Sequence, residues 1–345
     1  MKNARFNYFM DGFMKSNKII IFLIAIFIIS SFFTAYIYSQ ENELTNDDKL
    51  QVIDKLISEL NNAYIFPDIA LKMETFLREN LDNQKYNNIS NPTGFASVLT
   101  RDLRLISRDK HLHVDYFSEQ IPKEKSEPEE LTPVELERIR NMEESENFGF
   151  HKVKILKGNI GYIKLTSFMN PAHATKTIAN AFNTISNTEA LIIDLRENEG
   201  GNPYMVQLIC SYLFDSRILL NSIYWRNRNT TDEFYTLSYL EGKRYLEKKV
   251  YVLTSSKTFS AAEEFAYNLQ ALKRAIIVGE TTAGGAHPGI FVKLTDNFGM
   301  FLPTGVSINP ITKTNWEGTG VIPDVLCLEK DALKSAKKHI QNFKK

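Results

Sequence analysis

The sequence predicts an α/β protein with a small helical region ahead of its core, and two observations predict this class. Beyond residue 150, short apolar runs rich in β-branched residues alternate with segments of helical composition, an order typical of a mostly parallel sheet covered by helices. Before residue 119, apolar residues recur every three or four positions, which is the spacing of amphipathic helices.

The core consists of predicted strands and helices in alternation. The strands are continuous apolar runs, so we expect them to be buried on both faces. They cover residues 160–165, 190–195, 250–253 and 275–278. The helices between them cover residues 173–185, 205–214 and 260–272.

The helical region is predicted from three apolar stripes. The first stripe comprises Leu50, Val52, Ile53, Leu56, Ile57 and Leu60. Pro67 opens a second helix with Ala70, Met73, Leu77 and Leu81, and a third begins near Pro92 with Phe95, Leu99, Leu103 and Leu105. Residues 119–147 are dense in charge and proline, so we expect a solvated linker with at most one short helix.

The N-terminal residues predict export. Residues 19–38 carry no charge, follow four basic residues and precede an acidic, polar stretch. Such a run, as a helix, just spans a hydrocarbon core of about 30 Å, so it is either a retained single-pass membrane anchor or a cleaved signal peptide. Either outcome places the remaining chain outside the cytoplasm, in the cell envelope, the periplasm or the extracellular space.

These features divide the chain into five predicted segments. They are a basic cytoplasmic n-region (1–18), a signal peptide or anchor (19–40), a helical domain (41–118), a charged linker (119–150) and a core domain (151–345).

Charge and cysteine content exclude some classes of function. The 345 residues include 41 Lys plus Arg and 41 Asp plus Glu, so no excess of positive charge favours nucleic acid as a partner. Cys210 and Cys327 form at most one disulfide and cannot supply a four-cysteine zinc site. We therefore expect neither a metal nor another cofactor.

A serine lies where a predicted strand turns into a helix, in the segment TFSAAEEF that contains Ser260. Its hydroxyl and the following amides face the positive end of the helix, which suits a nucleophile whose oxyanion is held by backbone N–H groups. Glu263 follows three residues later, so the same spacing is also that of an ordinary capping box.

A paired glycine follows another predicted strand, in the segment DLRENEGGN. Gly200 and Gly201 allow positive φ and a close backbone approach, as an oxyanion cradle requires. The segment has neither the lysine of a Walker loop nor the glycine spacing of a dinucleotide site, and a tight turn without ligand is the alternative.

Two further segments offer acid–base groups. In DKHLHV, His111 and His113 alternate as on one face of a strand, so one of them is a candidate general base and a metal pair is a weaker alternative. In NWEGTGVIPD, Glu317 is a carboxylate that either orients an imidazole or is simply solvated.

Together and in this order, these segments resemble the tail-specific, C-terminal processing serine peptidases, particularly the branch similar to interphotoreceptor retinoid-binding protein and the tricorn core protease. The resemblance also rests on YIFP at 64–67, on GETTAGGA at 279–286 and on the terminal GVIPD at 320–324, and it covers nearly everything from Leu50 to Val325. It implies a twisted sheet with flanking helices of the Clp-protease/crotonase type behind the helical domain.

The resemblance also implies roles for individual residues. The nucleophile falls on Ser260, and the oxyanion donors fall on the backbone N–H of Ala261 and of Gly200 or Gly201. The lysine of the Ser/Lys branch is replaced by Gly285, so that dyad is not available. The tricorn-like branch instead implies His111 as base and Glu317 as its supporting carboxylate.

The chain departs from the resemblance in two places. Lys110 precedes His111 where the tricorn histidine has a serine neighbour, so the fourth member of that tetrad is not identified. The linker is too short to hold the PDZ module that many relatives carry.

The function implied is that of a serine-type peptidase acting on peptides or unfolded proteins through an acyl-enzyme. The alternative is a catalytically weak or inactive carrier for apolar ligands on the same fold. Retention of the serine, the histidine and the glutamate together favours the peptidase.

Overall fold

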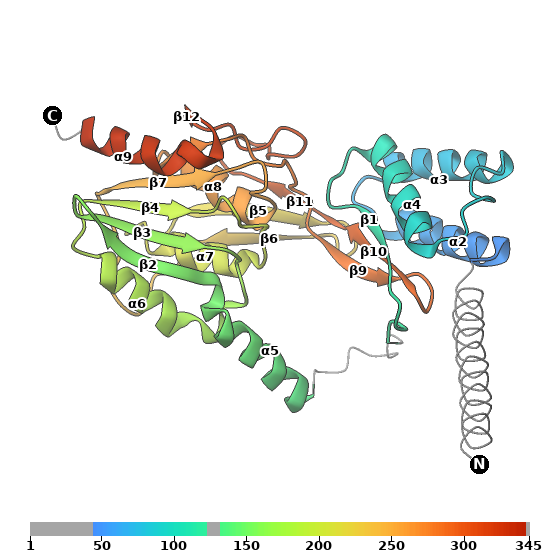
Figure 1. Cartoon of the computed structure of the whole chain (residues 1–345), viewed down its shortest axis with the longest axis horizontal. Helices are drawn as coiled ribbons and strands as arrows, with labels where there is room; N and C mark the ends of the chain where they lie inside the picture. Colours follow the sequence, from blue (N-terminus) through green and yellow to red (C-terminus); the bar gives the residue numbers. More distant parts are fainter. Residues whose placement is uncertain (1–43, 123–131, 343–345) are drawn as a thin grey trace, which may run out of the picture.

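The computed structural model describes residues 44–122 and 132–342 (Figure 1). The predicted signal peptide or anchor at 19–40 lies outside these residues. Among the helices that are described, none has both the length and the hydropathy needed to cross a membrane.

The core is a six-stranded sheet whose strands stand in the order β12-β8-β7-β4-β3-β2. All neighbours are parallel except β2, which runs antiparallel to β3. The strands are β2 (Phe150–Leu156), β3 (Ile160–Leu165), β4 (Ala190–Asp194), β7 (Lys249–Thr254), β8 (Ala275–Gly279) and β12 (Val325–Leu326). The four predicted strands are β3, β4, β7 and β8, so the α/β prediction is confirmed.

Helices cover both faces of this sheet (Figure 1). One face packs against α6 (Thr175–Ile185), α7 (Pro203–Ser211) and α8 (Ala261–Ala271). The other face packs against α9 (Ala332–Asn342). Burial on both faces explains why the strands are continuous apolar runs rather than alternating ones.

The helical region is built from α2 (Asn46–Ala63), α3 (Pro67–Asp82) and α4 (Pro92–Ser107), as the stripes predict. Leu50 and Leu105 were expected in its core, but their side chains are 45% and 65% exposed. Successive residues of a helix are rotated by about 100° around its axis, so Leu105 points roughly 120° away from the centre of the stripe formed by Phe95, Leu99 and Leu103. Leu50 lies at the margin of its own stripe.

Part of the core of the helical region comes from much later in the chain. Strand β1 (His113–Tyr116) pairs antiparallel with β10 (Phe298–Pro303), which pairs with β9 (Gly289–Lys293). Val292, Phe298, Met300 and Leu302 from these strands join the apolar cluster of α2, α3 and α4. The β9–β10 hairpin therefore lies between the core and the helical region, as Figure 1 shows.

The remaining elements are a second three-stranded sheet and one helix. The sheet has the order β11-β5-β6, with β5 (Leu219–Trp225), β6 (Thr230–Tyr235) and β11 (Gly305–Ile308). Helix α5 (Pro133–Ser145) is the short helix allowed for in the linker, and it begins at a capping box of Thr132 and Glu135.

Candidate active site

Ser260 lies in the turn between β7 and α8, at the cap position of the helix. Its backbone has φ 55° and ψ −122°, a conformation that costs a non-glycine residue on the order of 1–3 kcal/mol. A sharp strained turn from strand to helix is also the geometry that presents the nucleophile in α/β-hydrolases. The Ser260 backbone N–H donates to Glu263 Oε2 at 2.9 Å, while its hydroxyl contacts a histidine.

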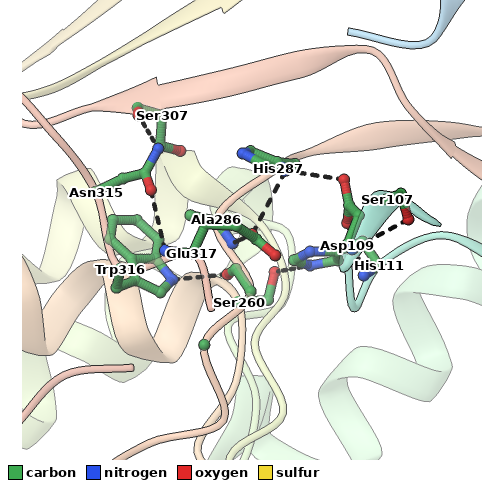
Figure 2. A network of polar contacts seen from close by, with 12 residues as sticks. Ser107, Asp109, His111, Ser260, Ala286, His287, Ser307, Asn315, Trp316 and Glu317 are labelled. Atoms are coloured by element: carbon green, nitrogen blue, oxygen red, sulfur yellow. Dashed lines mark hydrogen bonds and ion pairs between the residues drawn. The ribbon is translucent and has the colours of Figure 1, made fainter. Parts of the chain in front are cut away.

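That histidine is His111, whose Nε2 lies 3.0 Å from Ser260 Oγ (Figure 2). His111 lies in the loop between α4 and β1, and its ring packs 4.4 Å from the ring centroid of Phe259. Arg104 on α4 fastens the loop by donating to the carbonyls of Lys110 and Leu112 at 2.6 and 2.8 Å. The sequence-predicted nucleophile and base are therefore brought together by a preorganised loop.

Burial sets the protonation of His111. Desolvation lowers the pKa of its imidazole to about 4, although the nearby negative charge of Asp109 acts in the opposite direction. The ring is consequently neutral near pH 7 and can accept the serine proton. His113, the other histidine of the pair, is the first residue of β1; its ring contacts the His111 carbonyl and Asp115 and does not contact Ser260.

Glu317 lies in the same site but does not contact His111. Its Oε2 accepts the Ala286 N–H at 2.5 Å and lies 3.5 Å from His287 Nδ1. Glu317 Oε1 and His111 Nδ1 are among the buried side-chain atoms that have no hydrogen-bond partner in the described part of the chain. The structure thus brings the predicted carboxylate near the base without a direct hydrogen bond between them.

Asp109 and His287 are site residues that the sequence did not single out. Asp109 Oδ1 accepts the backbone N–H of His111 at 3.0 Å, and its Oδ2 lies 2.8 Å from His287 Nδ1 and accepts the Tyr64 hydroxyl at 3.2 Å. Asp109 belongs to the quoted DKHLHV segment, so its position beside His111 was a usable signal. His287 had no local signal, because its partners are remote in sequence.

Glu263 is the third residue whose role sequence reasoning underestimated. Its buried carboxylate accepts the N–H groups of Gly284 and Gly285 at 2.6 and 2.8 Å and the Thr282 hydroxyl, besides the Ser260 N–H. Burial raises its pKa to about 7 despite these donors. The capping-box spacing was the signal, but the residue also ties residues 282–285 to the serine turn.

The paired glycines pack directly against this turn. A Cβ on Gly200, whose φ is 110°, would lie 2.8 Å from Ser260 Cβ. The Gly200 N–H donates to Asn198 Oδ1 at 2.9 Å, whereas the N–H groups of Gly201 and Ala261 have no acceptor among the described residues. Ala261 is also the first residue of α8, where the helix dipole favours negative charge.

Gly285 lies beside His111. A Cβ there would lie 2.2 Å from the Phe259 ring and 2.9 Å from His111 Cε1. Any side chain at 285 would therefore compete with the imidazole for the same space.

Asp109, His287 and Glu317 are also the residues whose donor atoms could surround an ion. One potential ligand atom from each lies within 4.8 Å of the others. Because His287 Nδ1 already makes a 2.8 Å contact with the Asp109 carboxylate, we interpret the group as a hydrogen-bonded cluster rather than a metal centre.

Comparisons with known proteins show which family the chain resembles. Residues 159–327 match the sequence profile of peptidase family S41, and residues 46–155 match the profile described as the N-terminal domain of this family in eukaryotic IRBP. A carboxyl-terminal-processing protease of Synechocystis is 32% identical over 145 residues, which is 41% of this chain and 32% of that protein. The chloroplastic carboxyl-terminal-processing peptidase 2 of Arabidopsis thaliana is 29% identical over 48% of this chain and 31% of its own length. The chain thus spans about a third of the length of these curated relatives.

Solved structures show the same fold. A putative peptidase from Parabacteroides merdae superposes with a TM-score of 0.58 at 17% identity, covering 85% of this chain and 96% of its own. The tricorn protease superposes with a TM-score of 0.56 at 15% identity, covering 86% of this chain and 37% of its own. The predicted fold class, including the helical N-terminal region, is confirmed.

Proposed function

We propose that this chain, which belongs to peptidase family S41, hydrolyses peptide bonds through an acyl-enzyme on Ser260. The observation that carries the proposal is the 3.0 Å contact between Ser260 Oγ and a neutral, buried His111. A serine hydroxyl is a weak nucleophile until a base within hydrogen-bond distance can take its proton.

The reaction proceeds in two halves. Ser260 Oγ attacks the peptide carbonyl while His111 Nε2 takes the hydroxyl proton, and the resulting imidazolium returns that proton to the leaving amine. Water, deprotonated by His111, then hydrolyses the ester and regenerates the serine. The developing oxyanion is held by the N–H groups of Ala261 and Gly201, while Gly200 allows the two segments to approach closely.

Glu317 is proposed as the carboxylate that stabilises the imidazolium. His111 Nδ1 and Glu317 Oε1 are a donor and an acceptor that each have no partner among the described residues. We propose that a rotation of Glu317 or a bridging water pairs the two atoms when His111 becomes charged.

A histidine base is supported by the surroundings of Gly285. By the family resemblance, position 285 corresponds to the lysine of Ser/Lys relatives. The Cβ of any side chain at this position would lie too close to the imidazole of His111. The two kinds of base therefore exclude one another sterically in this site.

Substrate, location and domain organisation are also proposals. The names of the relatives point to cleavage near the carboxyl terminus of a protein, so we propose peptides and unfolded chains as substrates. Residues 19–40 are proposed to direct export or to anchor the chain, with the helical domain (41–118), the linker (119–150) and the core (151–345) outside the cytoplasm.

Cleavage of a peptide library at neutral pH tests the proposal. The full chain should release new amino termini, and Ser260→Ala should release none. A carrier for apolar ligands on the same fold would release none from either protein.

A further inference from the structure

A buried cluster of two carboxylates and one imidazole lies beside the proposed base. In Figure 2, His287 lies between Asp109 on one side and Glu317 on the other. Its Nδ1 is 2.8 Å from Asp109 Oδ2 and 3.5 Å from Glu317 Oε2. The side chains of Asp109 and His287 are 1% and 8% exposed, so water screens these charges little.

The cluster joins two parts of the fold. Asp109 precedes the base in the loop after α4, and the Tyr64 hydroxyl from the end of α2 donates to the same carboxylate. His287 precedes β9, and its ring packs edge-on against Phe66 at 5.2 Å. Glu317 comes from the segment after β11. His287 thus connects the loop that carries His111 to the core that carries Ser260.

The charges around His287 indicate the protonation state of its imidazole. Two ionised carboxylates within 4.8 Å of each other in a buried site repel strongly unless a cation lies between them. The other ionisable groups facing the cluster are Tyr64 and His111, and burial keeps both neutral near pH 7. An imidazolium at His287 is therefore the cation that the site itself can supply.

We propose that His287, as an imidazolium, is a positioning residue that holds Asp109 and Glu317 together and thereby fixes His111 opposite Ser260. This inference rests on the proposed peptidase function. Asp109 contacts the backbone of His111 rather than its ring, so the effect of His287 passes through the loop. Once His287 loses its proton, the two carboxylates repel each other and the loop is held less firmly, although Arg104 still binds the carbonyls of Lys110 and Leu112.

The protonation directions agree with this role. Burial lowers the pKa of His287, but the hydrogen bond and charge of Asp109 outweigh burial, so the pKa is raised overall. Burial also raises the pKa of Glu317. Both directions favour retention of a proton by the cluster.

The test compares His287→Gln with wild type and with His151→Gln, which removes an exposed histidine on β2 as a control. We measure the rate of Ser260 labelling by a fluorophosphonate from pH 5 to 10, together with thermal melting of each full-length protein. Wild type and H151Q should lose reactivity as pH rises through the pKa of His287. H287Q should label roughly 10²-fold more slowly at neutral pH and should lack this alkaline decline.

A second readout does not need catalysis. In the chain labelled with ¹⁵N-histidine, the signal that is missing from H287Q should be that of an imidazolium at pH 7. A neutral His287 at pH 7, or an alkaline decline that persists in folded H287Q, would overturn the proposal. Failure of wild type and H151Q to label at all would instead refute the proposed function, and the nitrogen signal would still decide the state of the cluster.

Discussion

Ser260 Oγ lies 3.0 Å from His111 Nε2, although 149 residues separate them in the sequence. The serine comes from the turn before α8 and the histidine from the loop after α4. The site therefore forms only when the helical region packs on the core, and the β9–β10 hairpin is the segment that joins the two.

The protonation of His111 predicts an acid limit for activity. Because burial lowers its pKa to about 4, the base stays neutral down to about that pH. We expect kcat/KM for a peptide to fall by half near pH 4, well below the ordinary histidine value of about 6.5. A pH–rate profile measures this, and an acid limb near 6.5 would contradict it.

Replacement of Glu263 by Gln should impair both stability and activity. Both carboxylate oxygens accept hydrogen bonds, and the amide group of Gln would turn one of them into a donor facing N–H groups. We expect E263Q to lose on the order of 3 kcal/mol of stability and to label slowly at Ser260. Urea unfolding at pH 9, where the Glu263 carboxyl is ionised, measures the first, and an unchanged midpoint would show that the contacts do not matter.

Replacement of Glu264 by Gln is a matched control, because it should raise the stability of the protein whereas E263Q should lower it. Its carboxyl is buried, and burial raises its pKa to about 8. The folded protein thus holds a proton that the unfolded chain releases above about pH 4.5, so this group lowers stability progressively as pH rises from about 4.5 to 8. E264Q should raise the free energy of unfolding at pH 8, and the gain should vanish at pH 4.

Gly285→Ala tests the space around the base. The added Cβ would push against Phe259 and His111, so labelling of Ser260 should slow by about 10²-fold. Gly158→Ala is the control, since Gly158 has a positive φ of 92° but its Cβ would meet nothing closer than 3.9 Å. Equal rates in G285A and wild type would show that the ring is not confined there.

Local pattern was enough to predict most of the core, whereas the proposed roles of Ser260 and His111 came from the family resemblance. The strands and helices of the α/β core are long apolar runs with clear turns, and Ser260 and His111 lie in short segments of recognisable type. The direction of the Glu317 side chain could not be predicted, because its contacts with Ala286 and His287 arise from folding of remote loops.

The roles of Glu263 and His287 were hidden for different reasons. Glu263 also fits an ordinary helix cap, so the spacing alone did not show that it also binds residues 282–285. His287 has no informative neighbours in sequence, and its partner Asp109 is 178 residues away. The predictions for Leu50 and Leu105 were wrong in the other direction. Both residues lie beside an apolar stripe and were counted as part of it, but their side chains are exposed.

The most direct test of the account is the site of fluorophosphonate labelling. Wild-type protein should form a covalent adduct, and peptide mass spectrometry should place it on Ser260, with no adduct on Ser260→Ala. Equal labelling of wild type and S260A would show that the activated nucleophile is another residue and would contradict the assignment of Ser260 and His111.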